Sequence, residues 1–111
     1  MGYVRCAVDL RTGTVTIDRP PVENALWKQQ TTQALSEGQI YQVVVERRRT
    51  TKGGFTDRAR VSLRVTDSGT GDPVRTIPVQ EFTGDHEGAA ARAMTIKDGV
   101  ARFWMEFWML D

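Results

Sequence analysis

The residues with the clearest chemistry are arginines that alternate with apolar residues in the middle of the chain. Over residues 46–64, seven basic side chains stand against two acidic ones, a local balance of +5, whereas the whole chain is only +1. Guanidinium groups bind phosphate through several donors, so this segment predicts contact with a polyanion. The same charges also fit a solvated strand face on which Glu46 pairs with arginines of a neighbouring strand.

Apolar residues recur at every second position over residues 39–66, which is typical of a strand rather than a helix. Two long antiparallel strands joined by a Gly-Gly loop are therefore expected, with one aliphatic and one polar face. The predicted polar face carries Gln42, Glu46, Arg48, Arg58, Arg60, Ser62 and Arg64.

Other reactive side chains are sparse. The chain has one histidine and one cysteine, and neither has a motif around it, so no nucleophile with a nearby base is expected and the protein is predicted not to be an enzyme. His86 stands between Asp85 and Glu87, but a lone histidine among loop acids is more often solvated than metal-bound. We expect no catalytic residues, no metal and no cofactor.

Length and composition predict one globular domain over residues 1–111 with a single core. Cys6 has no partner for an internal disulfide and is expected to be a small buried hydrophobe. The first ten residues lack the apolar core of a signal peptide, and no run of 18 apolar residues occurs. The sequence therefore predicts a protein of a cytoplasm-like space without a membrane partner.

The remaining segments are read from alternation and turn residues. Residues 3–10 and 15–18 alternate on both sides of a Thr-Gly turn and predict an N-terminal hairpin. Residues 22–38 fit either a helix or a short strand. Residues 67–78 are rich in Gly, Asp, Ser and Pro and predict a long exposed loop. Residues 79–97 hold an acidic patch followed by a strand.

The tail from residue 98 to 111 can be read in two ways. As a strand it would be apolar on both faces. As a helix with Asp98 at its N-terminus, it would gather its large residues on one side, and this template matches better. The residues on that side are Val100, Phe103, Trp104, Phe107 and Trp108. The predicted fold class is accordingly α+β, mainly β, with a short C-terminal helix packed on its own sheet or on a partner.

The order of these segments resembles the coat protein of the positive-strand RNA bacteriophages, the levivirus group. The resemblance covers about residues 3–80. It rests on a hairpin (AVDLRTGTVTID), a segment with a tryptophan (ENALWKQQ), two long strands (IYQVVVERRR and RARVSLRV), a loop ending in IPV and a further strand.

The resemblance implies an N-terminal hairpin and a five-stranded antiparallel sheet that is completed by dimerisation, with C-terminal helices crossing the partner. Such homodimers assemble into an icosahedral shell, the virion, in the cytoplasm of the bacterial host, and the inward sheet face binds single-stranded genomic RNA. Carried onto this sequence, the RNA face is Gln42, Val44, Glu46, Arg48, Arg58, Arg60, Ser62 and Arg64. The expected dimer interface is Phe103, Trp104, Phe107 and Trp108.

A viral capsid protein that packages RNA is therefore the function expected from the sequence. One alternative is a monomeric β-sandwich or OB-like module that binds single-stranded nucleic acid. Another is a tail or capsid protein of a DNA phage, which would assemble without RNA. Particle formation and its dependence on RNA distinguish the three.

Overall fold

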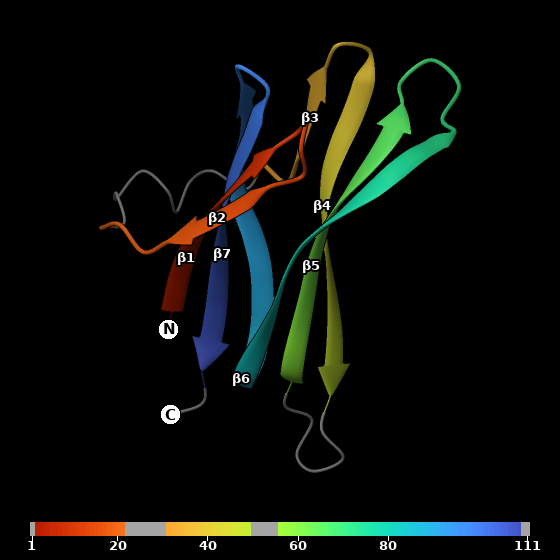
Figure 1. The fold of residues 1–111 in the computed structure, drawn as a ribbon. Helices are drawn as coiled ribbons and strands as arrows, with labels where there is room; N and C mark the ends of the chain where they lie inside the picture. Colours follow the sequence, from red (N-terminus) through yellow and green to blue (C-terminus); the bar gives the residue numbers. More distant parts are fainter. Residues whose placement is uncertain (1, 22–30, 50–55, 110–111) are drawn as a thin grey trace.

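The computed structural model describes residues 2–21, 31–49 and 56–109, and every regular element in these ranges is a strand (Figure 1). All strand pairs are antiparallel, in the order β2-β1-β7-β6-β5-β4-β3. The strands are β1 (Gly2–Asp9), β2 (Val15–Asp18), β3 (Gln33–Ser36), β4 (Gln39–Arg49), β5 (Thr56–Asp67), β6 (Pro73–Lys97) and β7 (Val100–Met109).

The strands form two layers because β6 changes its partner midway. Its first half pairs with β5 and its second half with β7, and the backbone of His86 pairs with both Thr56 and Met109. Figure 1 shows the first half descending beside β5 and the second half rising beside β7. Two backbone bonds link the start of β3 to other strands: Met94 N donates to Thr31 O, and Val43 N donates to Thr32 O. Strands β3 to β6 therefore form a partly closed barrel within the sandwich.

The core lies between the two layers and takes alternate residues from each strand. On β4 and β5 it receives Tyr41, Val43, Val61, Leu63 and Val65, and on β1 and β7 it receives Val4, Cys6, Val8, Ala101, Phe103, Met105 and Phe107. Burial of Cys6, which is 0% exposed, confirms the sequence prediction. This burial raises the pKa of the Cys6 thiol to about 12.

Two hairpins of the sequence analysis are confirmed. Strands β1 and β2 pair from Arg5 and Asp18 to Val8 and Val15. Strands β4 and β5 pair along nearly their whole length, with Val43 opposite Leu63. The alternation of aliphatic and polar residues was sufficient to set this register, because slipping by one residue would turn every side chain to the wrong face.

The predicted C-terminal helix, and with it the α+β class, was wrong. Residues 100–109 form β7, a central strand hydrogen-bonded to β1 on one side and to β6 on the other. Asp98 does not cap a helix. With Gly99 it forms the two-residue turn from β6 to β7, and both residues have positive φ, 54° and 74°. Phe103 and Phe107 face the core and Trp104 and Trp108 lie on the other side of the strand, partly buried, so β7 carries aromatic residues on both faces and lacks the alternation that marks a strand.

Three other expectations need correction. The N-terminal hairpin was expected to lie beside a separate sheet of about five strands, but it belongs to the same strand order, because β1 pairs with β7. The loop expected at 67–78 ends earlier, because β6 begins at Pro73. In the short turn that remains, the Asp67 carboxylate accepts hydrogen bonds from Gly69 N (2.8 Å) and Thr70 N (3.0 Å), and these bonds lower the pKa of Asp67. In the ambiguous segment, residues 33–36 are strand β3, and residues 22–30 lie outside the described part of the chain.

No helix of the length and apolarity that a membrane crossing requires occurs among the described residues.

Candidate nucleic-acid interface

The outer face of β4 and β5 brings the predicted polar residues together in rows. Cα pairing places Gln42 opposite Arg64, Val44 opposite Ser62, Glu46 opposite Arg60 and Arg48 opposite Arg58. Glu46 and the four arginines are exposed, whereas Gln42 and Ser62 are half-buried. We call this surface the arginine face. The reverse side of both strands packs into the core from Tyr41 to Val43 and from Ala59 to Val65.

At the end of this face, near residues 46–48 and 58–60, the structure contains a pocket of about 210 Å³. We call it the arginine pocket. It is lined by four arginines and two glutamates, namely Arg47, Arg48, Arg58, Arg60, Glu46 and Glu81. The lining therefore has an excess of two positive charges, and the volume is sufficient for a phosphate group with part of its sugar.

The ion pair of Arg58 with Glu81 in the arginine pocket is long and exposed. Arg58 Nη1 lies 3.7 Å from Glu81 Oε1, too far for a good hydrogen bond, and both side chains are about half exposed, 55% and 41%. An exposed pair of this kind is worth little and opens easily. Within the described ranges, Arg48, Arg60 and Arg64 form no ion pair. All three side chains are exposed.

Two lining residues were missed by the sequence analysis. By strand alternation Arg47 falls on the same side of β4 as Tyr41 and Val43, which face the core. It lies at the end of β4, beyond the core, and its side chain is exposed. Glu81 was assigned to an acidic patch, yet the pairing of β5 with β6 sets it opposite Arg60. Strand alternation alone would not find either residue. To place Arg47 one must know where the core ends, and to place Glu81 one must know that β6 pairs with β5.

The four aromatic residues expected at a dimer interface divide between two environments. Phe103 and Phe107 belong to the core of their own chain, 0% and 6% exposed, and the Phe107 ring centroid lies 4.9 Å from that of Phe82. Trp104 and Trp108 point to the opposite side of β7 and are half-buried. Phe103 and Phe107 are thus not available to cover a partner.

A second polar surface, which we call the paired face, is the outer side of β1, β2, β7 and the second half of β6. Arg5 donates to both carboxylate oxygens of Asp18, from Nε at 3.0 Å and from Nη2 at 2.6 Å. Arg92 Nε donates to Glu106 Oε2, and Glu106 is only 2% exposed. Partial burial, and then the carboxylate of Glu106, raises the pKa of Tyr3 beside this pair.

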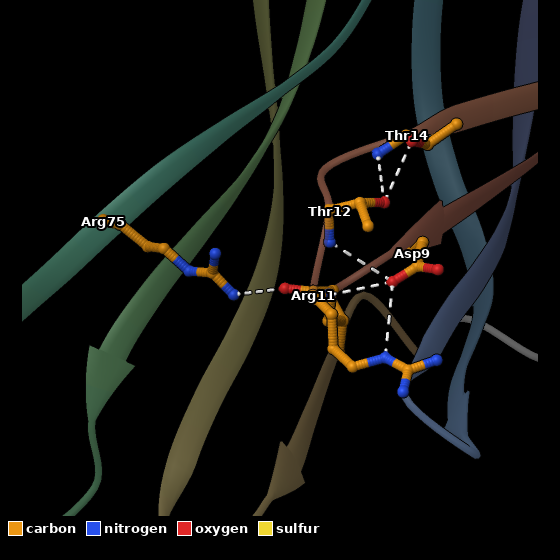
Figure 2. Close-up of polar contacts among 6 residues, drawn as sticks. Asp9, Arg11, Thr12, Thr14 and Arg75 are labelled. Atoms are coloured by element: carbon orange, nitrogen blue, oxygen red, sulfur yellow. Dashed lines mark hydrogen bonds and ion pairs between the residues drawn. The ribbon is translucent and has the colours of Figure 1, made fainter.

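The rest of the paired face is also balanced in charge. A shallow hollow of about 540 Å³ over Ala7 is lined by the charged residues Arg5, Arg102, Asp9 and Asp18, together with three threonines. Beside it, the Asp9 carboxylate accepts hydrogen bonds from the backbone of the β1–β2 turn, and Arg75 Nη2 donates to the carbonyl of Leu10 at 2.7 Å (Figure 2). The charged groups of this face thus have partners within the chain at Arg5, Arg75 and Asp9.

The side chains of residues 84–87 lie outside the described part of the structure, so the expected lack of a metal at Asp85, His86 and Glu87 stays a prediction. Comparison of the chain with known protein families, with curated proteins and with solved structures gives no match. Any functional conclusion therefore depends on the geometry of the surface.

Proposed function

We propose that this protein is a non-enzymatic β-sandwich domain that binds single-stranded RNA on the arginine face. The observation that carries the proposal is the arginine pocket, which four arginines and two glutamates line at the end of the β4–β5 pair. Phosphate oxygens accept several hydrogen bonds from one guanidinium, and such charge-assisted bonds are the strong ones. Approach of a phosphate displaces the long Arg58 to Glu81 contact at little cost.

The test is binding of a fluorescent single-stranded RNA over a series of salt concentrations. Wild-type affinity should fall steeply with salt, and the double variant Arg48→Ala, Arg60→Ala should bind more weakly. Its log-log salt slope should be less steep by about 1.4, because single strands lose about 0.7 for each phosphate that is no longer neutralised.

The matched control removes the same charge from the other side of the molecule. Arg11 and Arg102 are exposed on or beside the paired face, so Arg11→Ala, Arg102→Ala should leave the salt slope unchanged. Equal slopes for the two double variants would contradict the proposal, since net charge and not the arginine face would then determine binding.

A shell-forming coat function is the second candidate, and one observation favours it. β3 is an edge strand of the sheet, and Leu35 on it is 68% exposed. A second copy could pair along this edge and cover Leu35. Phe103 and Phe107 would take no part, because they lie in the core of their own chain.

Electron microscopy of the purified protein tests the coat function. Hollow particles that contain nuclease-protected RNA and are lost in the variant Leu35→Lys would support it. Particles that form equally well without RNA would favour a DNA-phage structural protein. A 12.5 kDa monomer that binds RNA would leave the binding module as the function.

A further inference from the structure

Two neighbouring rows of side chains in the arginine pocket differ in charge. In the first row, Arg48 of β4 lies opposite Arg58 of β5. In the second row, Arg60 of β5 lies between Glu46 of β4 and Glu81 of β6. The rows are two residues apart on β4 and β5, which is about 7 Å along a strand. All five side chains line the same pocket, so a ligand bound there meets a cationic row and a mixed row together.

The mixed row offers hydrogen-bond donors and acceptors side by side. A phosphodiester has acceptors only, so the cationic row suits it and the carboxylates of the mixed row repel it. Glu81 is already in contact with the cationic row, since its Oε1 lies 3.7 Å from Arg58 Nη1. Glu46 and Arg60 are then an acceptor and a donor that lie opposite each other on exposed positions of the two strands.

Guanine is the base whose edges match such a pair. One edge has two adjacent acceptors, O6 and N7, which an arginine binds with two parallel hydrogen bonds. The next edge has two adjacent donors, N1–H and the N2 amino group, which donate to the two oxygens of a carboxylate. Adenine and cytosine each offer one amino donor beside an acceptor, and uracil has a carbonyl on each side of N3–H. A carboxylate therefore binds these three bases less well.

We propose that the arginine pocket takes an unpaired guanine nucleotide, with its base held by Arg60 and Glu46 and its phosphate by Arg48 and Arg58. The inference rests on the RNA-binding function proposed above and adds the identity of the preferred base. Glu46 determines the specificity, because it accepts hydrogen bonds from the donors that pair with cytosine in a duplex. A guanine within a duplex uses those donors for its partner base, so the site takes it only when it is unpaired.

The test uses short oligouridine strands that differ at one central position, so that every ligand carries the same phosphates. The strand with guanosine should bind wild-type protein about 5- to 150-fold more tightly than the strand with uridine, which is the discrimination that one bidentate contact supplies. Inosine, which lacks the N2 amino group, and 7-deazaguanosine, which lacks N7, should each lose part of this difference. Equal affinity for all strands would overturn the inference and leave Glu46 as a cross-strand neighbour of Arg60 only.

Three variants assign the contacts. Glu46→Gln keeps the shape of the side chain but replaces one acceptor by a donor, so it should remove most of the difference between guanosine and inosine. Glu37→Gln removes the same charge from an exposed turn at the opposite end of β4 and should keep the wild-type ratio. Arg60→Lys keeps the charge but not the planar fork, and should remove most of the difference between guanosine and 7-deazaguanosine.

The outcomes separate this inference from the proposed function. If wild-type protein binds all strands alike, with a salt slope that Arg48→Ala, Arg60→Ala reduces, the guanine inference fails and RNA binding stands. If the salt slope of that double variant equals that of Arg11→Ala, Arg102→Ala, the proposed function itself fails. If Glu46→Gln and Glu37→Gln change the ratio of guanosine to inosine equally, the preference depends on net charge and the assignment of Glu46 is wrong.

Discussion

The arginines on the two outer faces of the sandwich differ in the ion pairs that they form. On the paired face, Arg5 meets Asp18 and Arg92 meets Glu106, each through a direct hydrogen bond. On the arginine face, the ion pair found among the described residues is the contact of Arg58 with Glu81 at 3.7 Å. The sequence contains both sets of arginines, and composition gives no means of telling them apart.

The difference follows from the registers of the strands. Pairing of β1 with β2 sets Arg5 opposite Asp18, so the guanidinium and the carboxylate meet directly. Pairing of β4 with β5 sets Arg48 opposite Arg58, so like charges are neighbours. Like charges directly opposite each other are unfavourable for a sheet. An arrangement that costs stability and remains exposed is better explained by a ligand than by folding, and this argument directs attention to the arginine face.

The largest effect is expected from breaking the buried pair of the paired face. Arg92→Ala leaves the Glu106 carboxylate, 2% exposed, without its cation. Loss of one member of a buried pair destabilises a protein by about 3–5 kcal/mol. Urea denaturation should show this as a lower midpoint, while RNA affinity of the folded protein stays unchanged.

A double variant tests whether charge or packing is responsible. Arg92→Met combined with Glu106→Leu removes both charges and keeps most of the side-chain volume, so it should recover most of the lost stability. If the double variant is as unstable as Arg92→Ala, the pair matters for its shape and not for its charge, and the contrast between the two faces weakens.

A smaller effect on stability is expected at alkaline pH, from the thiol of Cys6, which is buried beneath the paired face. Burial raises the pKa of Cys6 in the folded state to about 12, above the usual value of 9.0. The unfolded chain therefore releases this proton first, and the stabilising contribution, complete below about pH 9, is lost as pH rises from there toward 12. The loss is at most about 1.4 kcal/mol for each pH unit.

The measurement for Cys6 is the free energy of unfolding between pH 8 and 10.5, in the wild type and in Cys6→Ala. Lysines and tyrosines titrate in both proteins, so the difference between the two curves isolates the thiol. Stability of the wild type should fall more steeply. Parallel curves would mean that the thiol is accessible to solvent and that the half of the core under the paired face is loosely packed.

Alternation over residues 39–66 predicted the central hairpin and its polar face, because a two-residue period is a local signal. The C-terminal tail was mispredicted because a strand with large apolar residues on both faces has no such period, and Phe103, Trp104, Phe107 and Trp108 also fit a helix. The Asp98-Gly99 dipeptide, a strong hairpin signal, was the local evidence for a strand. The position of Glu81 opposite Arg60 depends on the pairing of β6 with β5, which no local pattern reveals.

The smallest effect on stability is expected from an ion pair introduced on the arginine face. Gln42 lies opposite Arg64, so Gln42→Glu would place a carboxylate across from that guanidinium. A cross-strand pair contributes about 0.2–1 kcal/mol, so the unfolding midpoint should rise slightly. RNA affinity should fall about threefold, because one guanidinium is now engaged and a negative charge lies beside the phosphate path.

Thr16→Glu adds the same charge to the paired face, where Thr16 lies exposed on β2, and should leave RNA affinity unchanged. Gln42→Met removes the amide without adding charge and should also bind RNA as the wild type does. If Gln42→Glu and Thr16→Glu weaken binding equally, RNA responds to net charge alone. A specific loss in Gln42→Glu would instead mean that RNA follows the arginine face from the pocket as far as Arg64.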